Sequence, residues 1–256
     1  MSDKTRCSWC GDTPIYVDYH DNEWGRPLHD DRKLFEFLIL EGAQAGLSWI
    51  TVLKKREAYR LAFDGFDPNV VALYGDAKIE ELMQNEGIVR NRLKINAAIT
   101  NAKLFLEVQK QHGSFDSFIW RYVDGKPVVG RFESIEDVPA TTPISDKMSK
   151  DLKKMGFKFV GSTIMYAFMQ ATGMVNDHFT DCFVYSELTG GSKIMSVEKL
   201  PWADNGRLLD KSSPPTEEEI KNHLGAQSYD RLNRFEEWLS RSYQLSKEMK
   251  FPFSVF

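Results

Sequence analysis

The sequence has little sulfur and no long apolar run. It contains three cysteines in 256 residues, whereas a scaffold held by disulfides needs more cysteines, usually in an even number. No apolar stretch approaches the roughly 20 residues that span a bilayer. The polar N-terminal residues lack the apolar core of a signal peptide. We therefore expect a cytoplasmic chain without a membrane partner.

The sequence also lacks a large excess of either charge. The 33 basic and 37 acidic residues give a net charge of −4, which argues against a chain coated with basic residues but leaves room for one basic face. Hydrophobic residues make up 42% of the chain and aromatic residues 12%, with six tryptophans. This composition is typical of an ordinary folded protein with one large domain or two small ones.

Strand patterns are nearly absent. Val128-Val129 is the best strand candidate, and it is too short to build a sheet. Apolar residues recur instead at helical spacing, in the segments 31–53, 68–73, 79–83, 95–108, 145–155 and 161–174. Asp67-Pro68 is typical of a helix start, and Gly113 and Gly156 mark helix ends. The pattern predicts an all-α fold.

The last part of the chain differs from the rest. Residues 186–215 are rich in glycine, proline and serine, as loops are. Residues 216–219 resemble a capping box, and an apolar stripe from Leu232 to Leu239 predicts a helix. We therefore divide the chain into a core, residues 1–185, and a C-terminal extension, residues 186–256, formed by a loop followed by a helix. The extension either packs on the core or binds a partner.

Sulfur and imidazole side chains could form one metal site. Five residues compete for the four places of a tetrahedral zinc site: Cys7, Cys10, His20, His178 and Cys182. The alternative is a set of buried thiols with a surface histidine. A closed site with four protein ligands would be structural, because catalysis needs an open position. It would join the beginning of the core to its end and add to the free energy of folding.

Three basic clusters, at 54–56, 90–94 and 147–158, are each either a solvated helix face or a contact with nucleic acid. The second follows Gly87, in a turn between two predicted helices. The backbone N–H groups of such a turn can bind a phosphate.

Long strings of the sequence resemble DNA-3-methyladenine glycosylase I, a family of the helix-hairpin-helix glycosylase superfamily. They are RCSW at 6–9, YVDYHDNEWG at 16–25, LEGAQAGLSWITVLKKR at 40–56, GFKFVGSTI at 156–164 and VNDH at 175–178. The resemblance covers residues 5–185 and implies an all-α helix-hairpin-helix fold.

The resemblance also implies roles for individual residues. It implies that the ligands of a structural zinc are Cys7, His20, His178 and Cys182, which leaves Cys10 as a spare. It implies that Glu41 and Tyr19 read the adenine edge and that Trp49 stacks on the base. The aromatic residues Tyr16, Trp9 and Trp24 are then either walls of the same pocket or part of the core.

The implied activity is the release of 3-methyladenine from alkylated double-stranded DNA by a monomer. Such an enzyme must extrude the base from the duplex. Methylation at N3 makes adenine cationic, and stacked aromatic rings and a carboxylate attract a cation. The family lacks the aspartate that stabilises the sugar cation in related glycosylases, so selective binding of the cationic base supplies most of the catalysis. We identify no amine nucleophile and expect a monofunctional hydrolase.

Contacts with the DNA backbone are expected at three places. The turn at Gly46-Leu47 could fill the gap left by the extruded nucleotide, as apolar wedges do. The other candidate contacts are Gly87, Arg92 and Lys94 in the second basic cluster, and Lys158, Ser162 and Thr163. Two other functions are compatible with the sequence: a zinc-stabilised DNA-binding protein without glycosylase activity, and a zinc hydrolase with an open site near Asp177 or Glu23.

Overall fold

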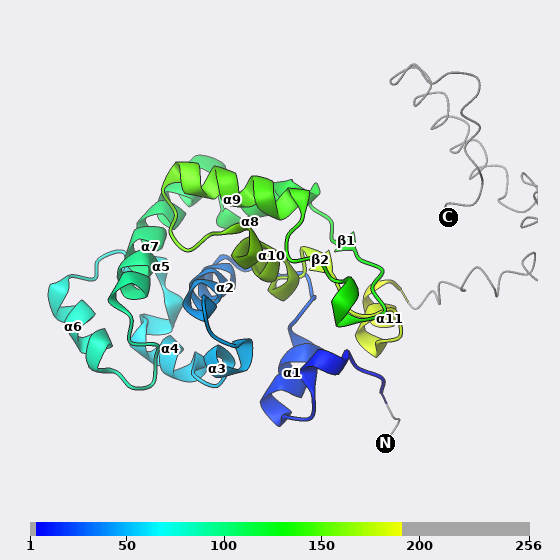
Figure 1. Ribbon diagram of the computed structural model, residues 1–256. Helices are drawn as coiled ribbons and strands as arrows, with labels where there is room; N and C mark the ends of the chain where they lie inside the picture. The colour runs from blue at the N-terminus through cyan, green and yellow to red at the C-terminus, as the bar shows by residue number, and fades with distance from the viewer. Residues whose placement is uncertain (1–3, 191–256) are drawn as a thin grey trace, which may run out of the picture. The chain divides into compact units, whose positions relative to one another are not determined.

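The computed structural model describes residues 4–190. The predicted C-terminal extension therefore lies almost entirely outside the described residues. Within them the chain is mostly helical, as the apolar periodicity predicts (Figure 1). The helices are α1 Pro14–Asn22, α2 Asp31–Gln44, α3 Trp49–Leu53, α4 Arg56–Ala62, α5 Pro68–Val71, α6 Asp76–Gln84, α7 Arg92–His112, α8 Phe115–Trp120, α9 Pro143–Met155, α10 Ser162–Ala171 and α11 Phe183–Leu188.

Helix α2 is the central element of the core. The side chain of Asp30 caps its first turn by accepting a hydrogen bond from the Lys33 N–H at 2.9 Å, as expected for an aspartate at this position. Every residue from Leu34 to Ala43 is buried, because α3, α7, α8 and α10 pack around the helix (Figure 1). A polar side chain in this stretch therefore faces either a partner inside the protein or a cavity.

Helices α9 and α10 form a hairpin beside α2. Thr142 and Ser145 form a capping box at the start of α9, and Gly156 ends the helix with φ +101°, a backbone conformation that favours glycine. Five residues, 157–161, then turn the chain into α10. This turn closely approaches α2 at Gly42, where a Cβ would lie 3.3 Å from the Cβ of Phe159, a tight contact.

The structure adds one strand pairing that we did not expect. Strand β1, Val128–Val129, pairs in parallel with β2, Val175–Asn176, and Phe132 forms a further bridge with Phe179. We had judged the first strand too short for a sheet, but its two residues pair with two buried residues of β2. The Phe183 N–H also donates to the Thr5 carbonyl at 3.0 Å. These contacts bring the two ends of the predicted core together.

Within residues 4–190, no helix combines the length and the apolar character that a membrane crossing requires.

Candidate functional site

A cavity of about 360 Å³ opens between two groups of elements. One wall comes from the N-terminal turn, α1, α2 and α3, and the other from α10, the segment 135–140 and the residues after β2. The first wall contains all six residues that we predicted to bind a base: Trp9, Tyr16, Tyr19, Trp24, Glu41 and Trp49. Residues from four separate parts of the sequence therefore meet in one cavity.

Glu41 is the most unusual group in this cavity. Its side chain is buried, with 3% of its surface exposed, and within the described part of the chain its carboxyl group has no hydrogen-bond or ion-pair partner. Burial raises the pKa of Glu41 to about 8, because the charged form is poorly solvated there. A glutamate is seldom buried without a partner, so this side chain is poised for a ligand.

Aromatic rings surround the carboxyl group. The ring centroids of Tyr19 and Trp49 lie 5.4 Å apart. The ring centroid of Trp9 lies 5.2 Å from that of Tyr16 and 4.8 Å from that of Trp24. Burial, and next the nearby Glu41, raise the pKa of Tyr19 well above its usual value, so its hydroxyl stays protonated and can donate. Aromatic faces of this kind attract a cationic ring.

Trp49 has a buried indole N–H without an acceptor among the described residues. A buried donor of this kind is costly to leave unpaired, which is a second sign that a ligand belongs here. Trp9 and Trp24 are half-buried and line the cavity while they also pack on the core. These two residues are therefore both part of the pocket wall and part of the core packing.

The opposite wall contains polar groups that sequence reasoning did not assign to the pocket. Asp177 is buried, and its Oδ2 accepts hydrogen bonds from the Tyr166 hydroxyl at 2.5 Å and the Gln170 Nε2 at 3.0 Å. Thr163, which we predicted to touch the DNA backbone, lies on this wall too. The sequence singled out Asp177 only as a neighbour of an open zinc site, and its place in the cavity depends on tertiary contacts.

A second cluster lies behind the aromatic wall. Cys7, His20, His178 and Cys182 are all buried, and their ligand atoms lie within 4.8 Å of one another. Cys10 is buried but is not part of this cluster. The Sγ–N distances are 3.5 Å for Cys7 and His178, 3.5 Å for Cys182 and His20, and 3.6 Å for Cys182 and His178. Two ligands on tetrahedral zinc, at about 2.3 Å for sulfur and 2.0–2.1 Å for nitrogen, lie about 3.6 Å apart.

Hydrogen bonds orient both histidines toward the two sulfurs. The Nδ1 of His20 is 2.8 Å from Asp21, which is held in turn by Arg6, and the Nε2 of His178 is 2.9 Å from the Trp24 carbonyl. Hydrogen bonds from Cys7, and then from the two histidines, lower the pKa of the Cys182 thiol. A carboxylate or carbonyl on the second ring nitrogen is the usual arrangement for a metal-binding histidine.

The predicted turn at Gly46-Leu47 is exposed beside the cavity. Gly46 has φ +80°, and the Leu47 side chain is 40% exposed. The turn joins α2 to α3, so it follows Glu41 and precedes Trp49. An apolar side chain at this place faces solvent next to the opening, as a wedge would.

Two backbone donors of the turn at Gly87, which precedes the second basic cluster, have partners within the protein. The Gly87 N–H donates to the Asn85 Oδ1 at 2.8 Å, and the Val89 N–H donates to the Tyr59 hydroxyl at 3.1 Å. Arg92 is paired with Glu80 at 2.7 Å. The Gly87 amide is thus engaged within its own turn, and its contact with a phosphate stays a prediction.

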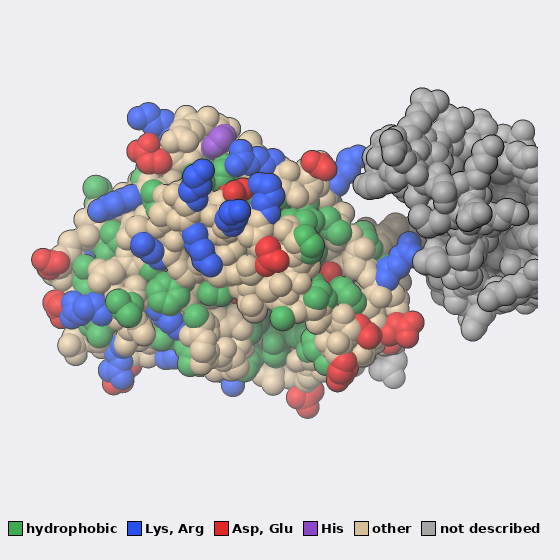
Figure 2. All heavy atoms as spheres, turned by 45° about the horizontal axis from the view of Figure 1, so that its top comes forward, with side chains coloured by type: hydrophobic (Ala, Val, Ile, Leu, Met, Phe, Trp, Pro, Cys, Tyr) green, Lys and Arg blue, Asp and Glu red, His purple; other side chains and the backbone are tan. Residues whose placement is uncertain are grey.

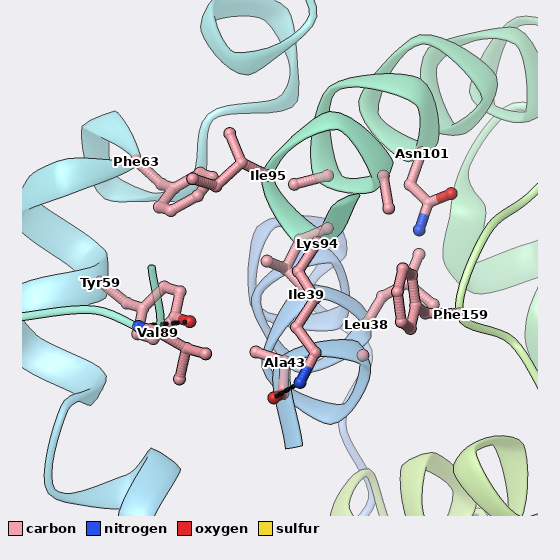
Figure 3. A pocket seen from close by; sticks show the side chains of 13 residues that line it. Leu38, Ile39, Ala43, Tyr59, Phe63, Val89, Lys94, Ile95, Asn101 and Phe159 are labelled. Atoms are coloured by element: carbon pink, nitrogen blue, oxygen red, sulfur yellow. Dashed lines mark hydrogen bonds between the residues drawn. The ribbon is translucent and has the colours of Figure 1, made fainter. Parts of the chain in front are cut away.

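Lys94 turns inward and serves the end of α2. Its Nζ donates to the carbonyls of Ala43 and Ala45, both at 2.7 Å. Figure 3 shows this side chain pointing into a small cavity of about 20 Å³ between α2, α4 and α7, with Phe159 on its far side. A cation at the C-terminus of a helix is favourable. Lys94 is thus a helix cap in this structure rather than a surface lysine.

Lys158, Ser162 and Thr163 lie together at the hairpin between α9 and α10. Lys158 is exposed, and Asn101 fixes its backbone through two hydrogen bonds, at 2.8 and 2.9 Å. The N–H groups of Ser162 and Thr163 begin α10 and have no acceptor within residues 4–190. Figure 2 shows Lys and Arg side chains gathered on this face of the molecule. Helix α9 carries four exposed lysines, Lys147, Lys150, Lys153 and Lys154.

Comparisons of the sequence with known proteins identify one family. The sequence model of the Methyladenine glycosylase family matches residues 9–185. The chain is 52% identical to DNA-3-methyladenine glycosylase of Haemophilus influenzae over 178 residues, which cover 70% of this chain and 96% of the relative. It is 51% identical to DNA-3-methyladenine glycosylase 1 of Escherichia coli, with the same coverage.

Solved structures show the same relationship. A crystal structure of 3-methyladenine DNA glycosylase I is 54% identical, with a TM-score of 0.68, and the match covers 70% of this chain and 98% of that chain. The 3-methyladenine DNA glycosylase I of Staphylococcus aureus is 40% identical, with a TM-score of 0.68, over 70% of this chain and 95% of that chain. On the matched sequence and the shared fold, the chain belongs to the methyladenine glycosylase family of N-glycosyl hydrolases.

Proposed function

We propose that this protein is a base-excision repair enzyme that extrudes 3-methyladenine from alkylated double-stranded DNA and releases it by hydrolysis. The observation that carries the proposal is Glu41, a buried carboxyl group without a partner in an aromatic cavity. A related structure of 3-methyladenine DNA glycosylase I is a complex with 3-methyladenine. The base is therefore the ligand with which this cavity is best compared.

Recognition of the base rests on charge and stacking. Trp49 and the other aromatic rings take the flat cation between them, at about 0.5–2 kcal/mol for each cation–π contact. Glu41 and Tyr19 lie where they can bind the polar edge of the base. A cation entering the cavity lowers the pKa of Glu41, because a nearby opposite charge favours the carboxylate. Neutral adenine lacks that effect, so the cavity favours the methylated base.

The chemistry then needs little acid–base help. A cationic purine is a good leaving group, and tighter binding of the extruded base in the transition state speeds its departure. Lysine is absent from the residues that line the described cavity, so no side-chain amine stands ready to form a Schiff base. We therefore propose a monofunctional hydrolase in which water completes the reaction.

The hairpin between α9 and α10 is the best-placed element to hold the DNA. The unpaired N–H groups at the start of α10 can bind a phosphate, and exposed lysines of α9 flank them. Thr163 connects this hairpin with the cavity wall. We propose that this hairpin, rather than the turn at Gly87, is the DNA-binding hairpin, and that Leu47 fills the space left by the base.

Zinc fits the cluster of Cys7, His20, His178 and Cys182. The donor set, its separations and the oriented histidines match a closed tetrahedral site. A zinc ion bound there would be structural. It would fix the aromatic wall, since Trp24 lies 4.6 Å from the ring of His178 and Trp9 lies 5.3 Å from that of His20. Four protein ligands would leave no open position, which disfavours a zinc hydrolase.

The test is the release of free base from methylated duplex DNA, followed by chromatography of the soluble products. We expect 3-methyladenine to be released by the wild-type protein and no protein–DNA adduct to form on treatment with borohydride. A protein that binds the duplex but releases no base is a DNA-binding protein without glycosylase activity, which refutes the proposal. A borohydride-trapped protein–DNA adduct refutes the monofunctional mechanism.

A further inference from the structure

A buried network of charges lies directly behind the base pocket. Arg56 is only 6% exposed, although the sequence suggested a surface cluster at 54–56. Its Nε donates to Glu36 at 2.6 Å, and its second N–H group donates to Glu23 at 2.8 Å. Arg60 adds a contact of 3.0 Å to Glu36. Arg56 and Arg60 thus meet at Glu36 in one network of opposite charges.

The members of this network belong to the elements that carry the base-binding residues. Glu23 directly follows α1, which carries Tyr19, and Glu36 lies on α2, which also carries Glu41. Arg56 begins α4, and two residues separate it from the end of α3, which starts at Trp49. A guanidinium group has separate N–H edges in a rigid plane, so it can bridge two carboxylates that a lysine would bind singly.

Arg56 also contacts the back of the aromatic layer. Its guanidinium lies 5.0 Å from the centre of the Phe37 ring. Phe37 stacks on Trp49 with centroids 6.5 Å apart and an interplanar angle of 21°, and it lies 6.5 Å from Tyr19. The cavity is on the front of Trp49 and Tyr19. A shift of Arg56 would therefore be transmitted through one ring to both residues.

We propose that Arg56 is a positioning residue: by bridging Glu23 and Glu36 behind Phe37, it holds Tyr19, Glu41 and Trp49 in the arrangement that binds the extruded base. This inference rests on the proposed function. A buried ion pair is weak evidence for stability, because apolar residues of similar volume often replace one without loss.

Two variants test the bridge. Glu23→Gln removes the charge at one end of the bridge, and we expect it to fold because the Glu23 side chain is 37% exposed. Arg56→Lys keeps the positive charge but loses the planar guanidinium group that binds two carboxylates at once. The matched control is Glu57→Gln, whose side chain is 77% exposed and is the other partner of Arg60. Each protein is also made with Trp49→Phe, and the difference in near-ultraviolet circular dichroism isolates the signal of that tryptophan.

Single-turnover release of 3-methyladenine is measured at a temperature at which every variant is folded. We expect the control to match the wild type, and Glu23→Gln and Arg56→Lys to be slower by about ten- to a hundredfold, since displacements near 1 Å have such effects. The Trp49 difference spectrum should change in these two variants alone. A purely structural network would lower the unfolding temperature but leave rate and spectrum unchanged.

The outcomes separate the two claims. A wild-type protein that releases no base refutes the proposed function, and with it this inference. A wild-type protein that releases base, together with Glu23→Gln at the wild-type rate and an unchanged Trp49 spectrum, refutes the inference alone. Glu23→Gln decides the matter even where Arg56→Lys fails to fold.

Discussion

Replacing Glu41 with glutamine should raise the free energy of unfolding, and the size of this increase should depend on pH. In the folded state burial holds the pKa of Glu41 at about 8, against an ordinary value of 4.5. Below pH 4.5 the group is protonated in both the folded and the unfolded states, so it does not affect stability. Above it the unfolded chain loses this proton while the folded chain keeps it, and the free energy of unfolding falls as pH rises until about pH 8.

The magnitude follows from the interval between the ordinary pKa and the pH. At about 1.4 kcal/mol per pH unit, Glu41 lowers the free energy of unfolding by about 3 kcal/mol at pH 7, where the pKa of the folded form is about 8. Glutamine has the shape of the protonated acid and carries no such penalty. The variant should therefore exceed the wild type by about 3 kcal/mol at pH 7 and by less than about 1 kcal/mol at pH 5.

Urea unfolding at pH 5 and pH 7 measures this difference directly. The control is Glu81→Gln on α6, whose side chain is 65% exposed, and its effect should be small at both pH values. An advantage of Glu41→Gln that is equal at pH 5 and pH 7 would refute the reasoning, because it would show that the carboxyl group is ionised in the folded protein without cost.

Three further predictions concern the metal, the DNA and the extension. We expect one zinc ion per chain by elemental analysis, and Cys182→Ser should lose the metal and lower the unfolding temperature; a metal-free protein of normal stability would contradict this. Lys158→Met should reduce the slope of log K against log salt concentration for DNA binding by about 0.9. Lys94→Met should leave that slope unchanged and cost about 1–3 kcal/mol of stability, since two carbonyls lose their donor; the reverse pattern would restore Lys94 as a DNA contact. A chain ending at Gly190 should keep the wild-type rate of base release, because the match spans 96% of the Haemophilus influenzae relative's length, and loss of activity would assign the extension a role in catalysis.

The helices were predictable because their signals are local. Asp67 caps α5, Gly113 ends α7 and Gly156 ends α9, as the sequence indicated. The pairing of β1 with β2 was not predictable, because it joins segments 47 residues apart in register, Val128 with Val175, and neither has a strand pattern long enough to be recognised.

The pocket residues and the four metal ligands were predicted through the family resemblance, because residue type alone left five candidates for the four metal positions. Glu41, Trp49 and the Cys/His set needed only to be brought together, and the structure places each set in one cluster. Basic residues behaved differently. Lys94 and Arg56 have ordinary surface patterns in the sequence, and only tertiary contacts decide that one caps α2 and the other is buried between two glutamates. A long charged side chain does not reveal its direction.

The most direct measurement is the single-turnover release of 3-methyladenine from methylated duplex DNA by the wild-type protein and Glu41→Gln, at neutral pH. We predict release by the wild type and a rate lower by about ten- to a hundredfold in the variant, equivalent to a charged hydrogen bond of about 1.5–3 kcal/mol, in a protein that is more stable than the wild type. Release by Glu41→Gln at the wild-type rate would show that the buried carboxyl group does not recognise the base.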